Sequence, residues 1–271
     1  MPYHKAADGT RLFVKDWGAG PTVVFVHAWS LDSTMWEYQF QAFLEAGFRC
    51  VAMDRRGHGR SEVPGHGYDL DTLADDLAGV LERLDLHDVT LVAHSMGTLE
   101  AGRHLGRQGG GRVGRAAFLG AMTPMLTRSH DNPHGIPAGY TEGVLADLRT
   151  DRPGWFHAAA PGYFATAGPP VSEAVVGDGI RQILATPLEV QVRCLRTVFG
   201  ADLRADLAAV DVPTLVMHGD ADRSAPIELT GRPTAALLRG SRLDVLPGEG
   251  HGLYVTAKDR VTAELLAFAK G

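Results

Sequence analysis

Ser95 lies at the centre of Ala93-His94-Ser95-Met96-Gly97, where an apolar run typical of a buried strand gives way to a run with helical spacing. A serine at such a junction is held in a tight turn, and small residues two positions away, here Ala93 and Gly97, let strand and helix approach closely. The first N–H groups of the helix would stabilise negative charge on a bound carbonyl oxygen. The segment therefore predicts Ser95 as a nucleophile and the N–H of Met96 as an oxyanion donor.

A serine hydroxyl needs a base to take its proton, and that base needs an acidic group to fix its tautomer. His251 is the expected base, because it lies in a glycine-rich loop directly after the last predicted strand. Asp220 and Asp222 follow the preceding strand, and Asp222 is the favoured acid. Asp220, nearer the strand end, is expected to accept backbone N–H bonds that shape the loop.

Ser95, Asp222 and His251 occur in the order nucleophile, acid, histidine, each in a loop after a strand, which is the chain order of α/β-hydrolases. In open α/β sheets, active sites form at the carboxyl ends of the strands, so these three side chains are expected to meet at one edge. Trp29 follows another strand and is the expected second oxyanion donor.

Strand-like and helix-like runs alternate along the chain, which predicts a parallel sheet covered by helices on both faces. This is the α/β class, and we expect an α/β-hydrolase fold with a mostly parallel central sheet, flanking helices and an inserted helical cap. The expected strands are 22–27, 48–53, 89–94, 116–119, 214–218 and 242–246, and the expected helices are 34–45, 70–84, 97–107 and 258–269.

Residues 122–207 contain no clean buried strand and are rich in proline, which indicates the cap. We therefore expect one domain, 1–271, whose core is 1–121 and 208–271. Several cap residues and two residues in core loops are expected near the substrate. These are Ser30, Leu126, Trp155, Tyr163, Val198 and Ala225.

The charge balance, 26 Lys+Arg against 32 Asp+Glu, gives no electrostatic footprint for nucleic acid or an anionic membrane, so a small molecule is the expected partner. We find no signal peptide and no apolar run of membrane-spanning length, which makes a cytoplasmic location the default expectation. Cys50 and Cys194 lack paired spacing and are expected as buried free thiols. His27 has no second ligand at suitable spacing, and Gly57-His58-Gly59 lacks a third glycine, so neither a metal nor a cofactor is expected.

Four further stretches resemble the cofactor-free haloperoxidase and arylesterase branch of the α/β-hydrolases over nearly the whole chain: 32–39, 54–61, 89–97 and 212–222. The resemblance implies a triad of Ser95, Asp222 and His251, an oxyanion hole at Trp29 and Met96, no cofactor, and hydrolysis of short-chain or aryl esters. Members of this branch often also show lactonase, amidase or perhydrolase activity.

The alternatives to an esterase are a lactonase, or an amidase or perhydrolase with the same triad, and a receptor on the same fold. A lactonase, including one acting on acyl homoserine lactones, would use the same triad. Ser30 stands where relatives with strong perhydrolase activity carry proline, so peroxide chemistry is not expected from the sequence. A ligand-binding receptor on this fold, with slow or irrelevant turnover, is the remote alternative. Relatives are often oligomeric, which leaves a homo-oligomer open.

Overall fold

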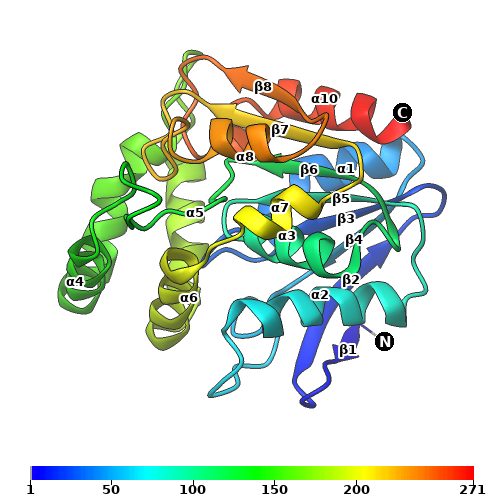
Figure 1. Cartoon of the computed structure of the whole chain (residues 1–271), viewed down its shortest axis with the longest axis horizontal. Helices are drawn as coiled ribbons and strands as arrows, with labels where there is room; N and C mark the ends of the chain where they lie inside the picture. The colour runs from blue at the N-terminus through cyan, green and yellow to red at the C-terminus, as the bar shows by residue number, and fades with distance from the viewer. Residues whose placement is uncertain (1) are drawn as a thin grey trace.

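The computed structural model describes residues 2–271 and is built on an eight-stranded sheet in the order β1-β2-β4-β3-β5-β6-β7-β8 (Figure 1). Neighbours from β4 to β8 run parallel, whereas β2 runs antiparallel to both β1 and β4. The mostly parallel α/β sheet expected from the sequence is confirmed. The strands are β1 (Tyr3–Lys5), β2 (Arg11–Trp17), β3 (Thr22–Val26), β4 (Arg49–Met53), β5 (Val89–His94), β6 (Val113–Leu119), β7 (Thr214–Gly219) and β8 (Arg242–Leu246).

The central strands form because apolar residues can be buried on both faces of a parallel sheet. All six residues of β5 and all six of β7 are buried. The antiparallel pair β1 and β2 was missed by the sequence prediction, which assigned no element before residue 22. Only the alternating Leu12 and Val14 of β2 are buried, and this weak period-two pattern is typical of a strand near a sheet edge.

Helices cover both faces of the sheet (Figure 1). Helices α2, α3, α7 and α8 pack in sequence over one face, and α1, α9 and α10 pack together over the other. The helices are η1 (Ser33–Trp36), α1 (Glu37–Glu45), α2 (Leu70–Arg83), α3 (Gly97–Gln108), α4 (Gly139–Tyr163), α5 (Glu173–Ala185), α6 (Leu188–Gly200), α7 (Arg204–Ala209), α8 (Gly231–Leu237), α9 (Leu253–Thr256) and α10 (Lys258–Lys270).

The segment between β6 and β7 holds α4 to α7, and α4 to α6 lie beyond the end of the sheet, at the left of Figure 1. These three helices share a small apolar core that includes Val144, Phe156, Ile180 and Leu195. Helix α7 instead packs on α3 over the sheet. Below, "the cap" means residues 122–203, which cover the carboxyl edge of the sheet.

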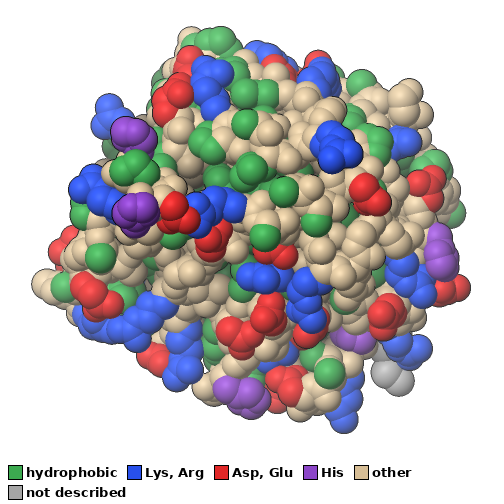
Figure 2. All heavy atoms as spheres, in the orientation of Figure 1, with side chains coloured by type: hydrophobic (Ala, Val, Ile, Leu, Met, Phe, Trp, Pro, Cys, Tyr) green, Lys and Arg blue, Asp and Glu red, His purple; other side chains and the backbone are tan. Residues whose placement is uncertain are grey.

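Charged side chains of both signs intermix on the face shown in Figure 2. Arg103 and Arg107 of α3 form ion pairs with acidic residues of α2 and α7. Cys50 and Cys194 are buried free thiols, as expected. Within residues 2–271, no helix combines the length and the apolar composition needed to cross a membrane.

Candidate active site

Ser95 sits in the turn between β5 and α3 with a φ of 56°, a left-handed conformation that is costly for a residue with a side chain. The surrounding core imposes this left-handed conformation on Ser95. The Ser95 N–H donates to the carbonyl of Leu119 on β6 at 3.0 Å, and a Cβ atom on Gly97 would lie 2.8 Å from the carbonyl oxygen of Val26. Only glycine at position 97 lets α3 approach β3 this closely, and the turn then presents the Ser95 hydroxyl to the cap.

The structure brings Ser95, His251 and Asp222 together. His251 Nε2 lies 2.8 Å from Ser95 Oγ, and its Nδ1 lies 2.6 Å from Oδ2 of Asp222. The three residues are 4–5 % exposed. Because an ionised carboxylate can only accept, Nδ1 carries the proton and Nε2 is left to accept the proton of the Ser95 hydroxyl. This arrangement can generate an alkoxide-like nucleophile in a nearly dry site.

The surroundings of Asp222 stabilise its ionised carboxylate. Its Oδ1 accepts the backbone N–H groups of Ser224 and Ala225 at 2.9 and 2.8 Å. Burial opposes ionisation, but the neighbouring imidazoles of His251 and His218 outweigh it and hold the pKa of Asp222 below its ordinary value. Asp220, as expected, shapes the loop instead, because its carboxylate accepts the N–H of Gly248 at 2.6 Å.

The loop that carries His251 is hydrogen-bonded to the end of α4. The N–H of Gly250 donates to the carbonyl of Ala165 at 2.7 Å, and the N–H of Gly252 donates to that of Tyr163 at 2.7 Å. A Cβ atom on Gly250 would lie 2.7 Å from the carbonyl oxygen of Tyr163, so the two segments are in close contact. The position of His251 is therefore set partly by the cap.

His94, which the sequence analysis did not assign a role, supports His251 from the core. Its Nε2 donates to the backbone carbonyl of His251 at 2.8 Å, and the two ring centroids are 4.7 Å apart. Burial, helped by the adjacent His251, holds the pKa of His94 well below its ordinary value, so the ring is neutral. Its place directly before Ser95 was the available sequence signal, but its partner is 157 residues away.

The two expected oxyanion donors lie beside Ser95. Trp29 and Met96 both line the cavity above the serine, and their backbone N–H groups donate to no other group within residues 2–271. The Trp29 indole donates to the carbonyl of Gln191 on α6 at 3.0 Å, so its side chain is fixed by the cap. Two unused N–H groups beside a serine can hold the oxygen of a tetrahedral intermediate.

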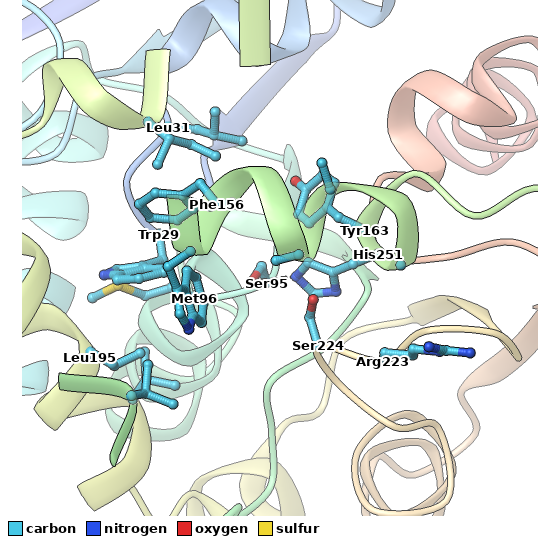
Figure 3. Close-up of a pocket in the computed structure, with 18 of the residues that line it drawn as sticks. Trp29, Leu31, Ser95, Met96, Phe156, Tyr163, Leu195, Arg223, Ser224 and His251 are labelled. Carbon is cyan, nitrogen blue, oxygen red and sulfur yellow. Dashed lines mark hydrogen bonds between the residues drawn. The ribbon is translucent and has the colours of Figure 1, made fainter. Parts of the chain in front are cut away.

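The cavity above Ser95 has a volume of about 310 Å³ and a largely apolar lining drawn from the core loops and from all three cap helices. In Figure 3, Trp29, Phe156 and Leu195 stand on one side of Ser95, and His251, Tyr163 and Ser224 stand on the other. A site of this size and polarity is suited to a small, mostly apolar molecule.

The expected pocket residues divide into two groups. Trp155, Tyr163 and Val198 line the cavity. The expectation was wrong for Ser30, Leu126 and Ala225, which do not line it. Ser30 adopts a φ of 63°, and its completely buried side chain lies behind the Trp29 turn. Leu126 packs into a cluster with Met96 and Val198, and Ala225 is completely buried beneath the Asp222 loop.

The chain was compared with known proteins. The family model for the alpha/beta hydrolase fold matches residues 21–258. A non-heme haloperoxidase of Rhodococcus erythropolis is 38 % identical over 271 residues, covering 99 % of both chains, and a non-heme chloroperoxidase of Kitasatospora aureofaciens is 40 % identical over 273 residues with the same coverage. Among solved structures, an esterase from Exiguobacterium antarcticum superposes with a TM-score of 0.94 at 31 % identity, covering 99 % of each chain.

Proposed function

The chain belongs to the α/β-hydrolase fold family, in the branch that includes the non-heme haloperoxidases, and on that premise we propose that it is a serine esterase. The observation that carries the proposal is the 2.8 Å contact between Ser95 Oγ and His251 Nε2 beneath a largely apolar cavity. The proposed substrates are carboxylic esters with short-chain or aryl groups.

In the proposed first half-reaction, the Ser95 oxygen attacks the ester carbonyl carbon while its proton passes to Nε2 of His251. The electron pair of the carbonyl moves onto oxygen, where the N–H groups of Trp29 and Met96 hold it. Collapse of the tetrahedral intermediate expels the alcohol, which takes the proton back from His251. The acyl group is then bound to Ser95 as an ester.

In the second half-reaction, a water molecule gives a proton to His251 and attacks the acyl carbon. The second tetrahedral intermediate releases the carboxylic acid and restores the Ser95 hydroxyl. Asp222 orients the imidazole and stabilises its cationic form in both halves without itself taking a proton. The leaving alcohol must face His251, and therefore the Tyr163 and Ser224 side of the cavity (Figure 3).

The proposal is tested with a panel of p-nitrophenyl esters of increasing acyl length, assayed on the wild-type protein and on Ser95→Ala. We expect multiple turnover by the wild type and a loss of roughly 10⁴-fold or more in kcat for the variant, because the nucleophile is missing. Circular dichroism checks that the variant is folded. Turnover by Ser95→Ala at the wild-type rate would overturn the proposal.

Perhydrolysis on the same acyl-enzyme is a second candidate, favoured by the haloperoxidase names of the relatives. Hydrogen peroxide would replace water as the attacking molecule, so that the acyl group leaves as a peracid, which can oxidise halide in solution. Halogenation of monochlorodimedone in acetate, bromide and peroxide measures this activity. Halogenation that depends on Ser95 would support it, and background halogenation in Ser95→Ala at the same rate would exclude it.

A further inference from the structure

The peptide unit between Ala28 and Trp29, at the active site, is hydrogen-bonded through its carbonyl to the buried guanidinium of Arg55. Arg55 is 1 % exposed and lies just after β4. Its Nη1 donates to the carbonyl of Ala28 at 3.2 Å, and its Nη2 donates to the carbonyl of His27 at 2.7 Å. The Ala28 carbonyl belongs to the same peptide unit as the N–H of Trp29. Arg55 therefore acts on the unit that carries one of the two oxyanion donors.

His27 makes a second contact with the same carbonyl. The backbone N–H of Arg55 donates to His27 Nε2 at 2.8 Å, so Nε2 is the acceptor and the ring proton lies on Nδ1. Nδ1 in turn donates to the carbonyl of Ala28 at 2.8 Å. Burial and the adjacent Arg55 hold the pKa of His27 well below its ordinary value, which keeps the ring neutral, and the two hydrogen bonds fix this tautomer.

The orientation follows from peptide geometry. In a trans peptide the C=O and N–H bonds point in opposite directions, so a carbonyl held toward Arg55 directs the N–H of Trp29 away from it. Ala28 and Trp29 both line the cavity on that other side. Hydrogen bonds to a carbonyl also polarise the peptide and strengthen its N–H as a donor, and a charged donor does so most.

The same arginine is tied to the helix that carries the other donor. Arg55 Nε donates to Oε1 of Glu100 at 2.5 Å, and Glu100 is completely buried in the first turn of α3. That helix begins directly after Met96, whose N–H is the second oxyanion donor. A single buried ion pair therefore connects the Trp29 loop to the helix that places Met96.

We propose that Arg55, together with His27, positions and polarises the Ala28–Trp29 peptide and so sets the strength of the oxyanion hole. The inference rests on the proposed esterase function and deepens it. Arg55 and His27 are positioning residues, because neither lines the cavity or contacts the reacting atoms. Glu100 fixes the guanidinium and links it to α3.

The chain supplies a matched control for Arg55. Arg56 is the next residue, is also 1 % exposed, and pairs with the buried Asp76 at 2.6 Å. Within residues 2–271, its side chain makes no hydrogen bond to the Trp29 loop. Arg55→Lys and Arg56→Lys therefore disturb comparable buried ion pairs, but only the first alters the Ala28 carbonyl.

The experiment measures kcat and KM for a p-nitrophenyl ester and the inhibition constant of an aryl trifluoromethyl ketone. Ser95 adds to the ketone carbon, its proton passes to His251, and the resulting alkoxide occupies the oxyanion hole. We expect Arg55→Lys to lower kcat roughly 10- to 100-fold, less than the loss of a whole donor, with KM nearly unchanged. Ketone binding should weaken by the same factor.

Arg56→Lys should leave kcat, KM and ketone binding within about two-fold of wild type, since it lies outside the site. Equal losses in Arg55→Lys and Arg56→Lys would overturn the inference, and so would a rise in KM at unchanged kcat. If Arg55→Lys does not fold, the double variant Arg55→Met/Glu100→Leu replaces the pair with apolar side chains, a change that buried ion pairs often tolerate. The same losses are expected in it, and wild-type ketone binding in the folded double variant would overturn the inference.

Failure of the proposed esterase function can be distinguished from failure of the inference about Arg55. It would appear in the wild-type protein, which would then hydrolyse none of the esters and would not bind the ketone, and the inference would fall with it. Failure of the inference alone would appear only in the Arg55 variants of an active wild-type enzyme.

Discussion

The two ends of the Ser95–His251 hydrogen bond differ in what holds them, because the serine end depends on the core alone and the histidine end depends on the cap as well. Ser95 is fixed by the sheet and by α3, through Leu119 of β6 and the close approach at Gly97. His251 is fixed by a loop whose neighbouring N–H groups donate to cap carbonyls at residues 163 and 165. The 2.8 Å contact between the two side chains therefore depends on the core at its serine end and on both the core and the cap at its histidine end.

This difference has a functional consequence. A change in the core at the serine end must disturb the sheet and hence the stability of the whole protein. A change at the histidine end can shift the imidazole by separating its loop from the cap while the sheet stays intact, and it should therefore cost less stability. Substitutions at the Ser95 end should therefore lower activity and stability together, whereas substitutions at the His251 end should lower activity more than stability.

The largest loss of activity without a matching loss of stability is expected for Asp222→Asn, which acts at the histidine end. An amide N–H in place of Oδ2 would face the proton on His251 Nδ1, so the ring would adopt the other tautomer and Nε2 could no longer accept the Ser95 proton. We expect kcat for ester hydrolysis to fall roughly 10³- to 10⁴-fold at nearly unchanged KM. A variant that keeps a tenth of the wild-type kcat would contradict this role of Asp222.

Two glycine-to-alanine substitutions allow the loss of activity and stability at the Ser95 end to be compared with that at the His251 end. In Gly97→Ala the new Cβ lies 2.8 Å from the Val26 carbonyl oxygen, and in Gly250→Ala it lies 2.7 Å from that of Tyr163. Gly97→Ala should cost about 1–3 kcal/mol of unfolding free energy as well as activity, because overpacked backbone in the sheet cannot relax.

Gly250→Ala should instead lower kcat roughly 10-fold or more while costing less stability, because the loop and the cap can separate. Equilibrium unfolding in urea and steady-state assays on both variants check the contrast. The comparison between core and cap would be broken if Gly250→Ala lost more stability than Gly97→Ala at equal activity.

A smaller effect is expected from a contact between the cap and the histidine loop. Oε1 of Glu249 accepts the hydroxyl of Thr166 at 2.8 Å. Thr166→Val removes this bond, and the one that the hydroxyl accepts from the exposed Gly168 N–H, at constant shape, and it should lower kcat a few-fold with about 1 kcal/mol of stability lost. Thr150→Val is the control, because among the described residues its hydroxyl bonds only to the Ala146 carbonyl of its own exposed helix. Equal activity in the two variants would show that the contact does not position His251.

The last prediction concerns pH and stability alone. The pKa of Asp222 is lower in the folded protein than the ordinary value of an aspartate side chain, so the folded state stabilises the ionised form. Its contribution to stability is fully present above that value and is lost as the pH falls toward the folded pKa. The difference in unfolding free energy between wild type and Asp222→Asn should therefore be constant above about pH 5 and decline below about pH 4. A difference that grows on acidification would reverse the assigned sign.

The sequence predicted the serine end more completely than the histidine end. The strand at 89–94 and the helix after Gly97 were recognisable because a fully apolar run meets a helical period at Ser95. The expected meeting of Ser95, Asp222 and His251 followed from the parallel sheet, whose strand ends share one edge. What the sequence could not provide was the contact of Gly250 and Gly252 with the cap, because carbonyl groups carry no sequence signal.

The wrong expectations have a related cause. Ser30 directly follows Trp29 in the chain, but the left-handed turn at Ser30 buries its side chain away from the cavity. Arg55 was visible only as part of a motif, and its contacts with Ala28 and Glu100 join segments 27 and 45 residues apart. Local patterns predict elements well, whereas the direction of a side chain within a loop depends on packing that no local pattern encodes.

The most direct test of the account is covalent labelling of Ser95 by diethyl p-nitrophenyl phosphate, followed by mass spectrometry of the peptide that carries it. This reaction requires the nucleophile and its base but no ester substrate, so its rate reports on the Ser95–His251 contact independently of preference for a particular ester. The account predicts rapid, single-site labelling at Ser95 in the wild type and labelling slower by roughly 10³-fold or more in His251→Gln. Equal rates in the two proteins, or a label on another residue, would contradict it.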